Sequence, residues 1–256
     1  MIYCDYDIEK LIRREHFDYL NSLPPIKRFT EKFRFELEEI PVHIKDSDAI
    51  FGWFGFTEKL PETELRIFDD CIRTDEEERE MYIQAESGST TFVDKSHVCA
   101  DYKFIIENGL AGYEKQIDEE LVKDPESEYL LAMKDVLRSV NGFSKRLGEK
   151  VQEVILTAPA EDIERLTKIK NAVEKVPYYP AENFLEAVQA VWIIHFLIPL
   201  AENGWCSVSV GTFDKYMYPY YEKDLKEIIK TTSLVMDGRD IGTVILPDTP
   251  YKFFLD

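Results

Sequence analysis

The sequence is short of positive charge and of clustered cysteine, and each shortage excludes a class of function. Its 256 residues include 31 Lys and Arg against 50 Asp and Glu, so the formal net charge is −19. Nucleic acids and anionic membranes bind positively charged surfaces, and we expect neither as a partner. The four cysteines form no CxxC pair and share no metal-ligand spacing with His, Asp or Glu. This pattern predicts free thiols in the reducing cytoplasm and no metal site.

The sequence also lacks a hydrophobic run suited to a bilayer and a loop suited to phosphate groups. The most apolar segment, residues 184–200, contains Glu186, Gln189 and His195, which favours a buried core helix over a membrane span. One Gly-Ser-Thr-Thr stretch is not followed by Gly-Lys-Ser/Thr, so it is expected to form an ordinary turn.

Helical periodicity dominates what is present. Apolar residues recur every three or four positions in three segments, as expected for helices that each turn one face to a core: 7–20, 26–40 and 127–156. A further helix is predicted at 159–175, because Pro159 marks a helix start and acidic residues follow in the first turn. The helix at 26–40 is predicted to bury a stripe of Phe29, Phe33 and Leu37. The sequence therefore predicts a mainly helical protein.

Two segments depart from this pattern. Residues 41–56 are aromatic and contain two glycines, which indicates a strand and a turn. Residues 100–110 predict a helix that stops at Gly109, with a second helix from Gly112. We therefore expect a few short strands among the helices.

The most informative stretch is residues 178–225. Glu186 and Gln189 share one face of its apolar helix, so they are expected to anchor neighbouring backbone and not to perform chemistry. His195 is expected to be a core histidine with a hydrogen-bond partner. The tyrosines at 216–221 are expected to pack with their hydroxyls bonded at the edge of the core.

Three motifs follow one another along the chain. His-x-x-x-Asp-Tyr begins at His97 and leads to Gly-Leu; Val-Pro…Pro-Ala-x-x-Phe-x-Glu-Ala-x-Gln covers 176–189; Ser-x-Ser-x-Gly-x-Phe-Asp-x-Tyr begins at Ser207. Together they resemble the glycyl radical enzymes, the family of pyruvate formate-lyase and of the glycerol and choline lyases. The resemblance covers about residues 1–224.

The resemblance implies a substrate-binding role for four residues and a catalytic role for none: His97, Asp101, Ser207 and Ser209. The alternative for His97 is a capping or core-edge histidine. For the two serines, turn chemistry is expected at one and a cavity position at the other. Thr212 stands where the family usually has arginine, so a structural or anion contact is expected to be missing.

The chemistry implied is radical cleavage of a C–C, C–O or C–N bond of a small substrate, or a formate C-acetyltransferase reaction. In the family, an activating enzyme with S-adenosylmethionine and an iron–sulfur cluster installs a glycyl radical, which makes a cysteine thiyl. Both radical residues of the family lie beyond the matched region, and neither is present here. We expect no bound cofactor and no turnover from this chain alone. Two alternatives stay open: a subunit completed by a second chain, and a non-catalytic remnant.

The resemblance also implies the N-terminal part of a ten-stranded α/β barrel built of two half-barrels, with the barrel incomplete. Uncovered apolar faces and strand edges then predict self-association.

Residues 225–256 form a tail that resembles a different family from the rest of the chain. Residues 234–248 resemble the nucleotide-contacting segment of cytidylate kinases, in which Arg239 and Asp240 would bind a phosphate and a ribose or base edge. Phosphoryl transfer needs a phosphate-cradling loop and its lysine, which the sequence lacks. CMP binding without transfer is therefore the weaker alternative function.

Overall fold

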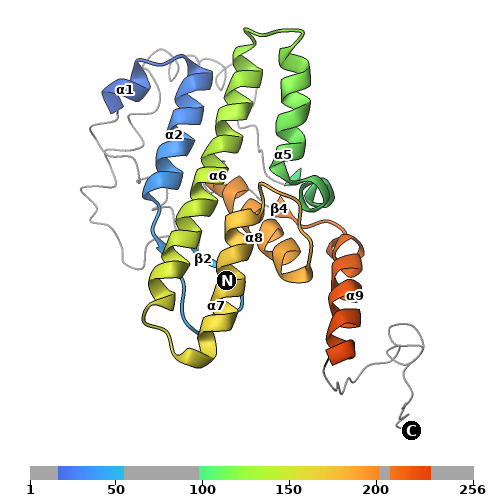
Figure 1. Cartoon of the computed structure of the whole chain (residues 1–256). Helices are drawn as coiled ribbons and strands as arrows, with labels where there is room; N and C mark the ends of the chain where they lie inside the picture. Colours follow the sequence, from blue (N-terminus) through green and yellow to red (C-terminus); the bar gives the residue numbers. More distant parts are fainter. Residues whose placement is uncertain (1–16, 55–97, 202–207, 232–256) are drawn as a thin grey trace, which may run out of the picture.

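A computed structural model describes residues 17–54, 98–201 and 208–231 (Figure 1). Within these ranges the elements follow in this order: α1 Phe17–Asn21, α2 Pro25–Glu39, β1 Val42–His43, β2 Trp53–Phe54, β3 Val98–Cys99, α5 Tyr102–Leu121, α6 Glu128–Ile155, α7 Ala160–Lys175, α8 Phe184–Ala201, β4 Val208–Ser209 and α9 Phe213–Thr231. The prediction of a mainly helical protein with a few short strands is confirmed for this part of the chain.

The long helix α6 organises the helical layer. It packs against α2 on one side and α7 on the other, and α5 lies near its N-terminal end (Figure 1). Val140, Leu147 and Val151 of α6 are buried, which is the face that the three- and four-residue spacing predicts. Burying these side chains stabilises the layer by about 1.5 to 3 kcal/mol each.

One detail of the predicted helices is wrong, and another is confirmed. Phe33 and Leu37 are buried, but Phe29 is 45% exposed, so the buried stripe of α2 is narrower than predicted. The helix predicted from residue 100 begins at Tyr102. Its predicted stop at Gly109 is confirmed, because Gly109 has non-helical φ and ψ of 68° and 174°, and a second helix follows across this kink within α5.

The kink in α5 turns three backbone groups toward the segment 177–181. Its hydrogen bonds join Leu110 N to Pro177 O at 2.9 Å, Ala111 N to Tyr178 O at 2.9 Å, and Ala181 N to Ile106 O at 2.8 Å. The segment that leads into α8 is therefore fixed against α5 by backbone hydrogen bonds, and the Tyr178 hydroxyl adds a side-chain bond to Glu114 of α5.

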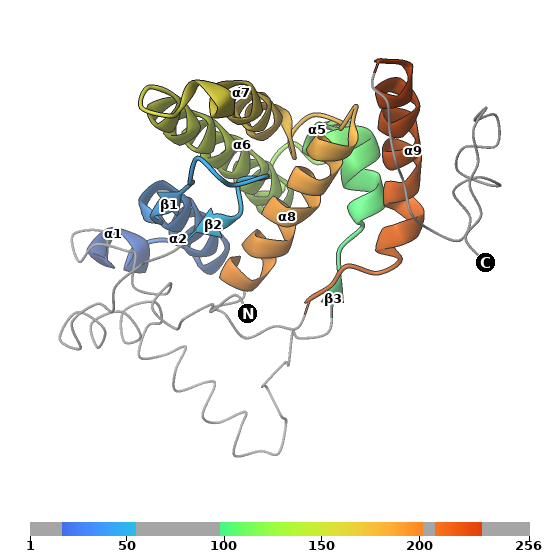
Figure 2. The same cartoon turned by 90° about the horizontal axis from the view of Figure 1, so that it is seen from below.

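Helix α8 is the core helix that its apolar sequence predicts. Among the described residues it is the one helix long and apolar enough to cross a membrane. It packs instead between α5, α7 and α9, with more than half of its length buried (Figure 2). Its first turn is capped by Asn183 Oδ1, which accepts from Glu186 N at 2.9 Å, and by Asp224 Oδ2 of α9, which accepts from Phe184 N at 2.8 Å.

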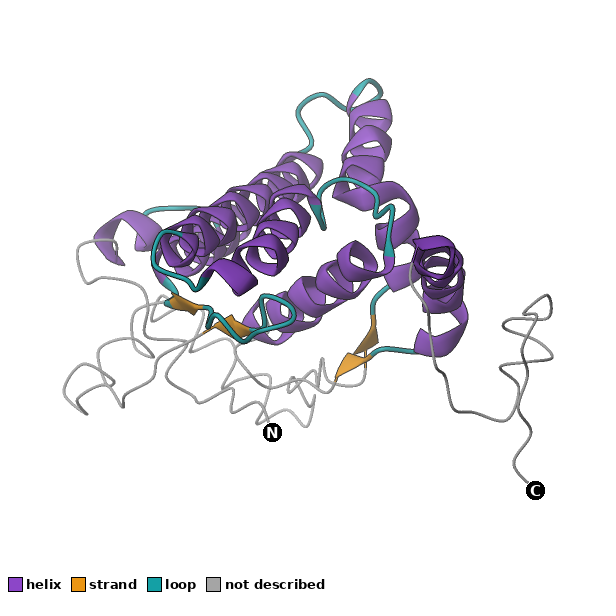
Figure 3. Ribbon diagram, turned by 60° about the horizontal axis from the view of Figure 1, so that its bottom comes forward, coloured by secondary structure: helices purple, strands orange, loops and turns teal. Residues whose placement is uncertain are grey.

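The four strands form two separate pairs on the same side of the helical layer (Figure 3). β1 pairs antiparallel with β2, and β3 pairs parallel with β4. Gln189 of α8 fixes the loop before β2: its Oε1 accepts from Phe51 N at 2.8 Å, and its Nε2 donates to Phe51 O at 2.9 Å. Glu186 Oε2 accepts from Glu182 N at 2.7 Å. Both residues anchor backbone, as predicted.

Candidate functional site

The parallel pair β3–β4 brings together two of the three motifs found in the sequence. Val98 pairs with Val208, and Cys99 pairs with Ser209. Of the predicted site residues, the structure describes Asp101 and Ser209. The other four lie outside the described residues: His97, Ser207, Arg239 and Asp240. In the sequence, His97 and Ser207 directly precede the register partners Val98 and Val208.

Asp101 and Ser209 are both exposed, and both hold local backbone. Asp101 is the N-cap of α5, because its Oδ1 accepts from Phe104 N at 3.0 Å. Ser209 Oγ accepts from Gly211 N at 3.0 Å. Each carboxylate or hydroxyl oxygen has a second lone pair, so these bonds leave room for a ligand. Their contact with a substrate stays a prediction.

Cys99 lies beside Ser209 at the exposed edge of the pair. It is a free, exposed cysteine, and its Sγ donates to Ala100 O at 3.5 Å. Gly211, with a φ of 62°, comes so close that a Cβ there would lie 3.0 Å from Cys99 Sγ. The strand pair therefore presents a thiol and a hydroxyl side by side, in a space that only glycine leaves open.

An aromatic cluster lies at the junctions where β3 and β4 lead into helices. Its members come from three helices: Tyr102 of α5, Trp192 and His195 of α8, and Phe213 and Tyr216 of α9. Tyr102 and Tyr216 stack with ring centroids 6.3 Å apart. Sequence reasoning missed the role of Tyr102, although its place directly after Asp101 in the first motif was the available signal.

His195 is the core histidine that the sequence predicts. Its Nδ1 lies 3.1 Å from the Tyr102 hydroxyl, and burial lowers the pKa of its imidazole. A neutral ring with unprotonated Nδ1 accepts a hydrogen bond from the Tyr102 hydroxyl, whereas a ring protonated at Nδ1 donates to that oxygen. Burial is what favours the neutral form of His195.

Stability is expected to fall through His195 as the pH drops. In the unfolded chain the imidazole has its ordinary pKa of 6.5, whereas the folded pKa is lower. The stabilisation from neutral His195 is thus fully present above pH 6.5 and is lost as the pH falls toward the folded pKa. Urea unfolding at about pH 7 and pH 5 should show a larger loss for the native chain than for His195→Asn, which does not titrate. Equal losses in both proteins would contradict this expectation.

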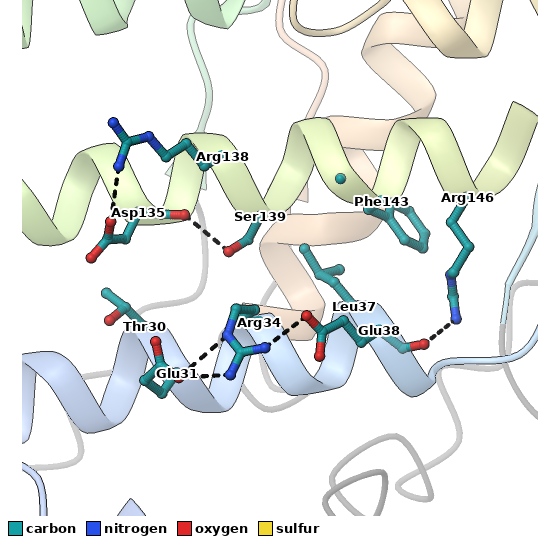
Figure 4. A pocket seen from close by; sticks show the side chains of 11 residues that line it. Thr30, Glu31, Arg34, Leu37, Glu38, Asp135, Arg138, Ser139, Phe143 and Arg146 are labelled. Carbon is teal, nitrogen blue, oxygen red and sulfur yellow. Dashed lines mark hydrogen bonds and ion pairs between the residues drawn. The ribbon is translucent and has the colours of Figure 1, made fainter.

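A pocket of about 340 Å³ lies between α2 and α6, apart from the strand pair (Figure 4). Its charges compensate one another. Arg34 binds Glu31 at 2.8 Å and Glu38 at 2.7 Å, while Arg138 lies 3.6 Å from Asp135. Arg146 also lines the pocket, so its three arginines balance its three carboxylates. The pocket therefore offers no strong recognition of an ion, and it is not the candidate site.

The geometry leaves the β3–β4 edge as the candidate site. Within the described ranges, no group of three His, Cys, Asp or Glu side chains lies close enough together to hold a metal ion. What the edge offers is hydrogen bonding: a serine hydroxyl and a thiol on two adjacent strands, with the Asp101 carboxylate at the N-cap of α5 directly after β3. Such an edge can orient the polar groups of a small molecule.

Comparison with known proteins adds to this geometry. The family model described as pyruvate formate lyase-like matches residues 62–235. The chain is 26% identical over 153 residues to the probable dehydratase YbiW of Escherichia coli K12, which covers 56% of this chain and 18% of YbiW. The match thus spans less than a fifth of that relative's length.

Solved structures show the same fold. A glycyl radical enzyme from Archaeoglobus fulgidus superposes with a TM-score of 0.65 at 22% identity, over 93% of this chain and 38% of that one. The glycerol-bound, B12-independent glycerol dehydratase of Clostridium butyricum superposes with a TM-score of 0.64 at 23% identity, over 84% of this chain and 34% of that one.

A separate short match concerns another kind of protein. Over 42 residues the chain is 52% identical to the cytidylate kinase of Acholeplasma laidlawii, which is 15% of this chain and 19% of the kinase. The predicted boundary between residues 224 and 225 falls within α9, which continues to Thr231. The division into residues 1–224 and 225–256 stays a prediction.

Proposed function

Because the chain belongs to the pyruvate formate lyase-like family, we propose that its β3–β4 edge forms the substrate-facing part of a glycyl radical enzyme. The single observation that supports this most is the parallel register of Cys99 with Ser209. It joins the strand that follows His97 to the strand that follows Ser207. On this proposal His97 and the serines contact one substrate from two strands.

The substrate we propose is small and carries hydroxyl or carbonyl groups. Ser209 and Asp101 are exposed and keep free lone pairs for such groups. The rings of Tyr102 and Tyr216, which follow the two strands along the chain, are buried and stack on each other. The family's radical supplies a hydrogen-abstracting thiyl when it is present. The residues of this chain bind and orient the substrate before a C–C, C–O or C–N bond breaks.

The completing parts are proposals as well. The thiyl cysteine and the radical glycine would come from further polypeptide, either continuous with this chain or in a second subunit, and an activating enzyme would be a third partner. Without these completing parts, we propose that the apolar faces and strand edges of the chain lead to self-association. We also propose that the protein acts in the cytoplasm of an anaerobic cell. A remnant without catalysis is the alternative.

The test is to express the chain with an activating enzyme and a polypeptide that carries the radical residues. Turnover of pyruvate, glycerol, 1,2-propanediol or choline is expected only in the complete mixture. In that mixture His97→Ala and Ser209→Ala should each lower kcat/KM about 10- to 100-fold, because each removes one polar contact to the substrate.

A matched control is Ser139→Ala, which removes a hydroxyl bonded to Asp135 O on α6 at 2.9 Å and should leave kcat/KM unchanged. Turnover by the chain alone would contradict the proposed division of the site. Unchanged kcat/KM in both site variants would contradict the proposed substrate contacts.

A second candidate function is nucleotide binding, which the 42-residue likeness to a cytidylate kinase favours. We propose that Arg239 and Asp240 contact the phosphate and the ribose or base of CMP. Calorimetric titration with CMP tests this directly, with Arg239→Ala as the variant that should abolish binding. No heat of binding at millimolar CMP would rule it out.

A further inference from the structure

Tyr102 and Tyr216 lie where the two strands of the site lead into their helices. Tyr102 is the first residue of α5, after β3, and Tyr216 lies in the first turn of α9, after β4. Their rings stack at an interplanar angle of 24°, and they are 1% and 9% exposed. The pair therefore closes the space between the two junctions.

The two hydroxyls bind different partners. Tyr216 donates to Val210 O at 2.7 Å, directly after β4. Tyr102 is bonded to His195 Nδ1 on the core helix α8. Two phenylalanines would fill the same space without the cost of burying two phenols, so it is the hydrogen bonds that distinguish tyrosine here. The two hydrogen bonds and the stacked rings between them connect the end of β4 to α8.

The backbone that Tyr216 holds belongs to the turn that sets Ser209. Val210 lies between Ser209 and Gly211. Across it, Ser209 Oγ accepts a hydrogen bond from Gly211 N at 3.0 Å. Burial, with a smaller contribution from Cys99, raises the pKa of Tyr216 to about 12, so its hydroxyl keeps its proton at neutral pH. The hydrogen bond to Val210 is therefore present throughout the physiological range.

We infer that Tyr102, His195 and Tyr216 are positioning residues, which hold β3 and β4 in the register that presents Cys99 and Ser209 to the substrate. The inference rests on the proposed function for the existence of that substrate. The holding of the strands rests on the described contacts alone.

The test is hydrogen exchange of the backbone amides at 208–211, measured by mass spectrometry on the full chain. Tyr216→Phe removes the bond to Val210 O but keeps the stacked ring. Exchange at 208–211 should become about fivefold faster, the effect of losing one ordinary neutral hydrogen bond. The control Tyr220→Phe removes a bond from the same helix to Ile106 O, at 3.3 Å, and should leave this exchange unchanged.

Equal exchange at 208–211 in the native chain and Tyr216→Phe would overturn the inference. So would faster exchange spread evenly over all helices, because that indicates only lost global stability. Should Tyr216→Phe not fold, Tyr102→Phe serves as the second variant, since it frees the same stack from His195 and should also speed exchange at 208–211.

Measuring KM and kcat separates a positioning role from a role in overall stability. In the mixture of this chain, an activating enzyme and a polypeptide that carries the radical residues, Tyr216→Phe should raise KM several-fold more than it lowers kcat. Tyr220→Phe should change neither. If the mixture is inactive with the native chain, the proposed function fails. The exchange result still decides whether the three residues hold the strands.

Discussion

Replacing Gly109 by alanine is expected to destabilise the chain by about 3 to 5 kcal/mol, a large part of a typical domain's stability. Gly109 has a φ of 68°, which costs any other residue energy. A Cβ there would also meet the backbone of 178–179: it would lie 2.7 Å from Tyr179 C and 2.8 Å from Tyr178 C. The hydrogen bonds from α5 to this segment would have to break to make room.

Urea unfolding of Gly109→Ala measures the effect, with Gly142→Ala as the matched control. Gly142 lies within α6, and a Cβ there would meet nothing within 4 Å. Alanine at that position should stabilise the chain by about 0.5 to 1 kcal/mol, because it is the better helix former. Similar effects of the two substitutions would show that the contact between α5 and segment 177–181 is not formed in solution.

Replacing Gln189 by leucine is expected to cost about 2 to 6 kcal/mol. The Gln189 side chain is fully buried and satisfies both backbone groups of Phe51. Leucine has a similar volume but neither a donor nor an acceptor, so one N–H and one C=O would be left buried without partners. Each such group costs about 1 to 3 kcal/mol.

The midpoint of urea unfolding gives the measurement, and Gln152→Leu gives the control. Gln152 is exposed on α6, where the same change should alter stability by less than about 0.5 kcal/mol. Gln189→Glu adds a second point, since it keeps the acceptor for Phe51 N but loses the donor to Phe51 O. Equal stability of Gln189→Leu and Gln152→Leu would contradict the buried role.

The helices could be predicted because their signal is local. The spacing of Val140, Leu147 and Val151 placed α6 within a residue or two, and Pro159 marked the start of α7. The predicted burial of Phe29 on α2 was wrong. A periodic pattern indicates which face of a helix is apolar, but not how much of that face the neighbouring helices cover. That extent depends on α6, which lies far along the chain.

The contacts between distant segments could not be predicted in the same way. The sequence indicated that Gln189 anchors backbone, but only the structure identifies that backbone as Phe51. The pairing of Cys99 with Ser209 left no local pattern, since each strand is only two residues long. Recognition of the family suggested that both segments face one cavity, and the parallel register is consistent with that suggestion.

The parallel pairing of β3 with β4 also sets an order of folding. The two strands are separated in the sequence by the whole of α5, α6, α7 and α8. Closing so long a loop carries an entropic cost that no local contact offsets. The α6–α7 hairpin joins neighbouring helices, so it needs much less loop closure and can form first. We expect the β3–β4 edge to be the last part acquired during synthesis and the first to open in the native chain. A polypeptide that supplies further strands next to this edge would then stabilise it in the act of assembly.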